Sequence, residues 1–240
     1  MSSRNLNNTP SAIHLSGLLQ PTSADTAKAI IDMRDRDLIS LHQDLKKWIK
    51  AALSNADSKL LSRAASSLPC ETVRQKRVKN AVIEILPLLA EFMTTHDVKW
   101  FKPIHKKRVF EFTRSATVPI APIGYGLIDG SVKLVFSPTW KYRDLTPQQF
   151  RIWATLVHIG WLNTDPDLEG FTYINMSTSP SQDARVLSVR DESDAVDLLT
   201  PLELSWVRRT VDDAMIVVGK TERKKKTRKT KVNPQGELDI

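Results

Sequence analysis

The feature that most constrains the fold is a stretch of alternating apolar residues in the middle of the 240-residue chain. It consists of an alternating run at residues 109–114, a glycine-rich segment at residues 124–130 and a second apolar run at residues 131–136. Apolar and polar residues that alternate between glycines or prolines are typical of strands. Pro119 and Pro122 limit the segment between the runs to a loop or an irregular edge. The stretch therefore predicts a β-hairpin or meander.

Two helices that follow have clear starts. Thr146 and Thr200 each precede a proline, and Gln149 and Glu203 stand at the third helical position, where they complete a capping box. Gly219 is well placed to end the second helix. The residues expected to face inward are Phe150, Trp153, Ala154, Val157 and Trp161 in the first helix, and Leu204, Val207, Val211, Ala214 and Val218 in the second. The first helix is expected to pack over the hairpin.

The N-terminal part reads as a helical layer, residues 23–95, after a flexible arm at residues 1–22 that is rich in Ser, Asn, Thr and Pro. A helix capped by Ser23 is predicted to carry one apolar stripe, made of Ile31, Leu38, Leu41, Leu45 and Trp48. Most of its charged residues, Lys46, Lys47 and Lys50 among them, fall off that stripe, so it should lie on a surface. A short helix at 58–66 and a helix at 71–94 follow. Pro87 is expected to kink or break the latter near Glu84. Its inward residues should be Val78, Val82, Ile85, Leu86, Leu89 and Phe92.

Residues 171–175 and 184–189 read as further strands. The whole pattern predicts an α+β protein in which an N-terminal helical layer adjoins a small, mainly antiparallel central sheet covered by helices. The α+β core is expected at residues 96–219, and a basic disordered tail at residues 220–240.

The net charge of +8 is unevenly distributed. Residues 220–231 carry eight basic residues and one glutamate, which gives +7, whereas residues 160–219 carry eleven acidic and four basic residues, which gives −7. No signal peptide and no transmembrane segment is expected, because no apolar run approaches the roughly 18 residues that a bilayer span needs. A single cysteine, Cys70, leaves no internal disulfide framework.

The basic tail gives the strongest functional signal. Its cationic residues are Lys220, Arg223, Lys224, Lys225, Lys226, Arg228, Lys229 and Lys231. Such a run suits phosphate backbones such as RNA, anionic membrane surfaces and nuclear import receptors. Two alternatives remain open. The tail could simply increase solubility, or it could contact the acidic segment 160–219 of a neighbouring copy, which would make a homo-oligomer.

A second basic segment combines lysines with aromatic residues between the helical layer and the hairpin. Its candidate binding residues are Lys99, Trp100, Phe101, Lys102, Lys106, Lys107 and Arg108. Aromatic side chains within a cationic strip can stack on unpaired bases or anchor in a headgroup layer. The same aromatic residues could equally be core residues at the edge of a domain, and the sequence leaves both possibilities open.

No catalytic, cofactor-binding or metal-binding residue is predicted, and the chain is not expected to be an enzyme. The glycines at 124, 126 and 130 lack the spacing of a dinucleotide fingerprint, and a hairpin turn at Asp129 and Gly130 explains them more simply. The five histidines share no ligand spacing with Cys70 or with an acidic pair. An enzyme would need a pocket that gathers residues distant in the sequence.

Residues 125–137, with the sequence YGLIDGSVKLVFS, resemble a strand-turn-strand stretch in the matrix proteins of rhabdoviruses, where a Gly-Leu-x-x-Gly-Ser/Thr-Val/Ile-x-Leu run crosses the sheet. The basic tail is similar to that of the plant-infecting members that replicate in the nucleus. The chain departs from the family in lacking a Pro-Pro-x-Tyr motif and in the distance of the stretch from the C-terminus. The resemblance implies a non-enzymatic virion protein that condenses nucleocapsid and links it to membrane, located in the virion and in the host nucleus or cytoplasm. The alternative is a nuclear nucleic-acid-binding regulatory protein.

Overall fold

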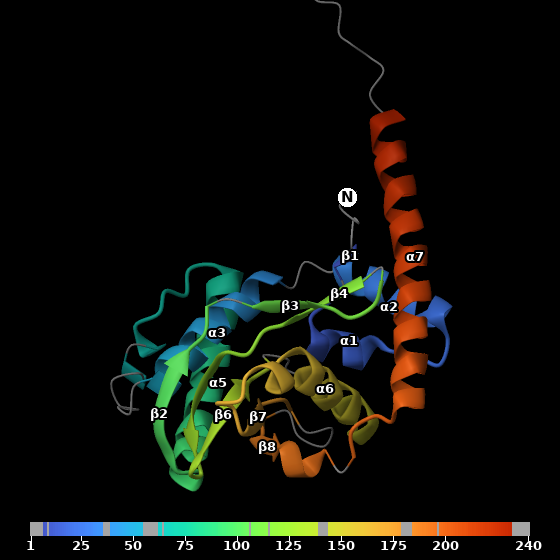
Figure 1. Ribbon diagram of the computed structural model, residues 1–240. Coiled ribbons are helices and arrows are strands. Elements are labelled where there is room, and N and C mark those ends of the chain that lie inside the picture. Colours follow the sequence, from blue (N-terminus) through green and yellow to red (C-terminus); the bar gives the residue numbers. More distant parts are fainter. Residues whose placement is uncertain are drawn as a thin grey trace, which may run out of the picture. The chain divides into compact units, whose positions relative to one another are not determined.

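The computed structural model (Figure 1) describes residues 7–8, 10–35, 39–54, 62–63, 65–105, 107–114, 116–138, 144–178, 184–195 and 197–231, and only the backbone for residues 7–8, 34–35, 39–43 and 222–231. The chain forms two compact units. The first unit comprises residues 1–36, 110–119 and 199–240, and the second unit comprises residues 37–109 and 120–198. The residues predicted as one helical layer, 23–95, are therefore divided between the two units.

The second unit is built on a five-stranded sheet with the strand order β2-β5-β6-β7-β8. The strands are β2 (Val98–Pro103), β5 (Gly124–Ile128), β6 (Ser131–Phe136), β7 (Gly170–Asn175) and β8 (Ser188–Asp191). Neighbouring strands are antiparallel except for β6 and β7, which are parallel and are connected through helix α6 (Pro147–Gly160). The prediction of an α+β fold with a mainly antiparallel sheet is confirmed.

The β5–β6 hairpin has the tight turn that the sequence predicts. Ile128 pairs with Ser131, so Asp129 and Gly130 form a two-residue loop, and both have positive φ angles, 52° and 81°. Such a loop matches the twist of the flanking strands. The other glycines serve a different purpose, because they lie within β5. A Cβ atom on Gly126 would lie 2.4 Å from the carbonyl oxygen of Trp100 in β2, so the close approach of two strands explains this glycine.

Helix α6 covers one face of the sheet with an aromatic core. Its capping box is present as predicted, since Thr146 accepts from the Gln149 amide and Gln149 accepts from the Thr146 amide. All five residues expected to face inward are buried. The Trp153 ring lies 5.0 Å from Phe136 and 4.9 Å from Phe171, measured between ring centroids. The edge-to-face geometry of these pairs is the arrangement that aromatic quadrupoles favour.

Helices α3 (Ile39–Ser54) and α5 (Val73–Thr95) pack against a second apolar cluster, which includes Ile128, Val135 and Ile174 of the sheet. The buried residues of α5 are Ala81, Val82, Ile85, Leu86, Leu89 and Phe92. Of the kink or break predicted near Glu84, the break does not occur, because α5 continues through Pro87. Apolar residues are buried both before and after Pro87, and their burial offsets the roughly 3 kcal/mol that a proline costs in a helix interior.

The first unit contains the helices α1 (Ala12–Leu18), α2 (Ser23–Asp35) and α7 (Pro201–Lys231) and a small sheet with the order β1-β4-β3. Its strands are β1 (Asn7–Asn8), β4 (Ala116–Ile120) and β3 (Arg108–Glu111), of which the last two residues of β3 and the first four of β4 belong to this unit. Pro119 lies within β4, the middle strand of this sheet, so the prediction of a loop or an irregular edge is wrong at this position. Within this unit α2 and α7 pack against each other (Figure 1).

Two N-terminal predictions are also wrong. Residues 10–22 do not form a flexible arm, because α1 buries Ala12 and Leu15 almost completely. The single helix predicted from Ser23 is two helices, α2 and α3, and residues 36–38 lie outside the described residues. The cap of α2 is Thr22, whose hydroxyl accepts from the Asp25 amide at 3.1 Å. An apolar period of 3.6 residues can continue across a helix boundary, so the pattern alone could not show the division.

Smaller boundary shifts occur elsewhere. The run predicted at 109–114 forms the shorter strand β3, because the amides of Phe112 and Thr113 both bond to the Ala116 carbonyl oxygen and turn the chain. The strand predicted at 184–189 is β8, Ser188–Asp191, preceded by an isolated bridge between Thr178 and Arg185. Of the helix predicted at 58–66, residues 62, 63, 65 and 66 are helical and the others lie outside the described residues.

Helix α7 has the predicted start but not the predicted end. The Thr200 hydroxyl accepts from the Glu203 amide at 3.3 Å, and the Glu203 carboxylate accepts from the Thr200 amide at 2.8 Å. The helix does not stop at Gly219 but continues to Lys231, so residues 220–231 are helical rather than a disordered tail. Gly219 lacks the positive φ angle that a terminating glycine adopts. Residues 232–240 lie outside the described part of the chain.

Candidate anion-binding surfaces

The C-terminal part of α7 carries the predicted basic residues on a continuous helix. The eight cations of residues 220–231 follow directly on the turns that bury Val211, Ala214 and Val218. Within the first unit, these last turns extend past α1 and α2 (Figure 1). Lys220 is exposed, and the side chains beyond Thr221 lie outside the described residues. We call residues 220–231 the basic block.

The helical backbone fixes how densely this charge is arranged. A rise of about 1.5 Å per residue places twelve residues along roughly 18 Å. A charge of +7 on that length, from eight basic residues and one glutamate, is one net charge per 2 to 3 Å. Duplex nucleic acid carries one negative charge per about 1.7 Å. At about 100° per residue the basic positions lie all around the helix axis. The positive charge of the basic block is therefore comparable in linear density to the negative charge of a nucleic acid.

The first half of the second basic segment forms strand β2, which divides the aromatic residues between two faces. Phe101 is partly buried against the apolar cluster beneath α3 and α5. Trp100 points to the opposite face, where 42 % of its surface is exposed. The alternation of side chains along β2 thus resolves what the sequence left open. Phe101 belongs to the core, and Trp100 belongs to the surface.

Around Trp100 lies a small aromatic and cationic surface. Its ring contacts Tyr125 of β5 edge to face, with the centroids 5.7 Å apart. Lys102 is exposed and places its ammonium nitrogen 6.0 Å from the centroid of the same tyrosine. Lys99 is exposed but is paired with Asp97 at 2.8 Å, which compensates its charge. Trp100, Lys102 and Tyr125 form what we call the β2 outer surface.

The remaining basic residues of the segment have different surroundings. Arg108 stacks its guanidinium 4.4 Å from the Trp161 ring centroid and lies 3.9 Å from the Asp165 carboxylate, so it has a structural role. Lys107 is exposed. Lys106 lies outside the described residues. The structure therefore does not bring all the predicted residues of 99–108 together on one surface.

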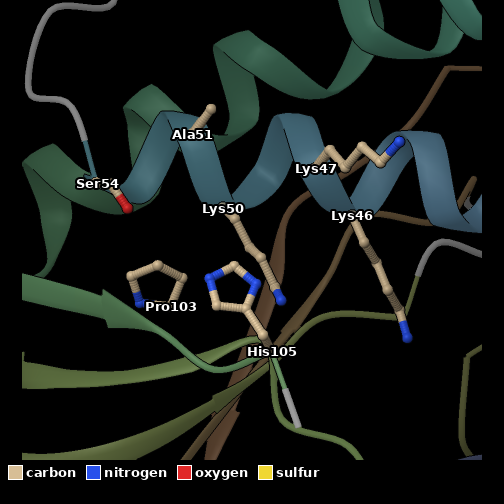
Figure 2. Close-up of a pocket in the computed structure, with 7 residues that line it drawn as sticks. All are labelled: Lys46, Lys47, Lys50, Ala51, Ser54, Pro103 and His105. Atoms are coloured by element: carbon tan, nitrogen blue, oxygen red, sulfur yellow. The ribbon is translucent and has the colours of Figure 1, made fainter.

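A third cationic surface was not predicted. A pocket with a volume of about 490 Å³ lies between α3 and the end of β2 and is lined by Lys46, Lys47, Lys50, Ala51, Ser54, Pro103 and His105. We call it the lysine pocket. In Figure 2 the side chains of Lys46 and Lys50 extend from the same side of α3, and the His105 ring lies beside Lys50. Lys50 donates a hydrogen bond to the Ile104 carbonyl oxygen.

Burial gives the lysine pocket unusual electrostatics. Loss of hydration lowers the pKa of Lys46, and the positive charge of Lys50 lowers it further. Loss of hydration also lowers the pKa of Lys50. Within the described part of the chain, neither lysine has a carboxylate partner, whereas the neighbouring Lys47 lies 3.8 Å from Asp44. Lys46 and Lys50 are thus near enough for the charge of one to act on the other, and both are partly dehydrated without a carboxylate partner among the described residues.

Other polar contacts in the second unit have a structural role. His96 and the Asp97 amide both bond to Asp129, at 2.9 Å each, and this tethers the hairpin turn. The bond from His96 is the main reason why the pKa of Asp129 is lowered. Buried Tyr173 donates to Asp144, which also accepts from Arg190, and burial raises the pKa of this phenol well above its ordinary value. Among the described residues no cluster of His, Cys, Asp and Glu could hold a metal ion.

Two findings concern the chain as a whole. None of the described helices is long and apolar enough to cross a membrane. No family model, no curated protein and no solved structure matches the chain.

Proposed function

We propose that the chain is a non-enzymatic structural protein of the viral matrix type, which binds nucleocapsid RNA through the basic block and links it to an anionic membrane. The observation that carries this proposal is the continuation of α7 into the basic block, because it fixes a dense positive charge to a folded unit. Most contacts of such a helix with RNA would be to phosphates and would release counterions, so binding would be strong at low salt and independent of sequence.

The β2 outer surface supplies a contact of a second kind. An exposed tryptophan beside a lysine can stack on an unpaired base, and stacking contributes about 1 to 3 kcal/mol per base. Lys102 would at the same time neutralise a phosphate. This contact would give a preference for single-stranded over double-stranded RNA, which the basic block alone would not give.

The proposal is tested by RNA binding at several salt concentrations. In the block variant, Lys224, Lys225, Lys226, Arg228 and Lys229 are all replaced by alanine. Each lost phosphate contact should reduce the slope of log affinity against log salt by about 0.7 for single-stranded RNA. The matched control keeps the charge by replacing the four lysines of the set with arginine. The control should bind like the wild type, and an unchanged slope in the block variant would rule the basic block out.

A nuclear nucleic-acid-binding regulatory protein would use the same basic block, so a second measurement separates the two functions. A matrix-type protein should self-associate at low salt and sediment with anionic liposomes. A chain that binds RNA but remains monomeric and ignores liposomes would support the regulatory function. The block variant should also lose nuclear accumulation if an import receptor reads this segment.

A further inference from the structure

We propose that the lysine pocket is a binding site for a single phosphate group, presented either by a small phosphorylated molecule or by a lipid headgroup. The inference does not rest on the function proposed above, because the lysine pocket belongs to the second unit and the basic block to the first. It follows from the shape of the pocket, the set of donors that line it and the uncompensated charge.

The donor set is arranged along one row of α3. Lys46, Lys50 and Ser54 follow one another at intervals of four residues, so neighbouring side chains of the row start about 5 to 6 Å apart. Two neighbouring ammonium groups, those of Lys46 and Lys50, can donate to the oxygens of one phosphate, and Ser54 adds a hydroxyl one turn beyond Lys50. His105 adds a further ring nitrogen from the opposite wall. The lining contains no carboxylate that would repel an anion.

The electrostatic state of the pocket favours an anion over an empty site. Lys46 and Lys50 repel each other and have lost part of their hydration, and both effects disfavour their charged forms. A bound phosphate would oppose both effects, because it brings negative charge close to both nitrogens. Lys50 keeps two donor hydrogens after its bond to the Ile104 carbonyl oxygen. The same bond holds the Lys50 ammonium against the end of β2, which reduces the ordering needed on binding.

The volume favours a small ligand. About 490 Å³ lies in the range of small-molecule sites, roughly 300 to 1,000 Å³. Ala51 and Pro103 supply an apolar part of the wall, against which the organic part of a phosphorylated molecule could lie. A long polyanion needs an extended row of cations, which the basic block provides and this pocket does not.

The test uses the full chain and inorganic phosphate as the probe, with sodium chloride at equal ionic strength as the reference. Amide resonances of residues 46–54 and 103–105 should shift and saturate with phosphate, apart from any shifts in residues 220–231. Lys46→Gln should weaken the binding about tenfold, because a charge-assisted hydrogen bond is lost. The matched control is Lys76→Gln, an exposed lysine of α5 outside the pocket, which should change the affinity less than twofold.

A second measurement does not depend on how the variant folds. Phosphate added to the wild-type chain should raise the pKa of the Lys46 ammonium, followed by NMR of isotopically labelled lysine side chains. Vesicles of phosphatidylcholine with and without phosphatidic acid then identify the source of the phosphate. A specific loss of vesicle binding in Lys46→Gln indicates a headgroup, and equal vesicle binding indicates a free molecule. Absence of saturable shifts around Lys46, or equal phosphate affinity in Lys46→Gln and Lys76→Gln, would overturn the proposal.

Discussion

The basic block of α7 and the lysine pocket of α3 are both cationic helical segments, yet they differ in how their charge is held. The basic block has a net charge of +7 in residues 220–231, arranged all around a helix. The lysine pocket has three lysines and a histidine, and its two central lysines are partly dehydrated. The basic block is distinguished by its high density of positive charge, and the lysine pocket by the partial dehydration of Lys46 and Lys50.

The difference teaches that two clusters of positive charge need not select the same ligands. The basic block should bind a long polyanion through many separate charge contacts. Charges in water are screened within about 10 Å at 0.1 M salt, so the affinity of the block for the polyanion should fall steeply as the salt concentration rises. Charges at a partly dehydrated site are screened less, so the pocket should depend less on salt and more on the shape of its ligand. Binding at the basic block is thus expected to depend mainly on salt, and binding at the lysine pocket mainly on the shape of the ligand.

The largest expected effect is that each of two variants loses affinity for one ligand and keeps its affinity for the other. The block variant should lower the affinity for single-stranded RNA at low salt by about a hundredfold or more, since several phosphate contacts are lost at once. It should leave phosphate binding at the lysine pocket unchanged. Lys46→Gln should show the opposite pattern. Fluorescence anisotropy with labelled RNA and NMR titration with phosphate measure the two affinities. A comparable loss of both affinities in one variant would show that RNA and phosphate bind at the same site.

The next effect concerns the continuity of α7. Gly219→Pro should destabilise the helix by about 3 kcal/mol, because proline removes an amide donor and clashes with the preceding turn. Gly219→Ala should stabilise it by about 0.5 to 1 kcal/mol, since a Cβ atom there would contact nothing within 4 Å. If the number of charges binds RNA, whatever their spacing along the chain, Gly219→Pro should reduce RNA affinity less than threefold while circular dichroism shows lost helix. A loss as large as that of the block variant would mean that the basic block must be held as a continuous helix.

The smallest effect concerns stability. Lys46→Met keeps the length of the side chain but removes its charge, and should raise the free energy of unfolding by about 0.5 kcal/mol at neutral pH. The pKa of Lys46 is lower in the folded state, so the folded chain loses this proton before the unfolded chain does. The unfavourable contribution of charged Lys46 to the free energy of unfolding should therefore become smaller as the pH rises from the lowered pKa toward the ordinary value of 10.5. The advantage of Lys46→Met over the wild type should shrink over that range in urea unfolding, and an advantage that grows there would contradict the dehydration argument.

Features that depend on neighbouring residues in the sequence could be predicted. The capping boxes at Thr146 and Thr200 and the turn at Asp129 and Gly130 each need only three or four consecutive residues, and all are present. The inward face of α6 follows from the helical period alone. Cationic character at residues 220–231 is likewise a local property, although its helical state is not.

Features that depend on distant partners were missed. The stripe assigned to residues 23–48 as one helix gave no sign that α2 packs with α7 while α3 packs with α5. The lysine pocket was missed for a related reason. Lys46 and Lys50 read as an exposed face of α3 until β2 is placed beside it, and the sequence pattern does not predict a strand at residues 98–103. Their spacing of four residues was the one available signal, and it is common on solvated helices.

The position of β2 at the end of the sheet has a consequence for assembly. A strand with one unpaired edge can recruit a strand from another copy and propagate a continuous sheet, which is a route to aggregation. Lys99, Lys102 and Pro103 on this strand oppose such growth, because charge and a missing amide donor both discourage a further strand. If copies of the chain associate in an ordered way, they are expected to do so without extending this sheet.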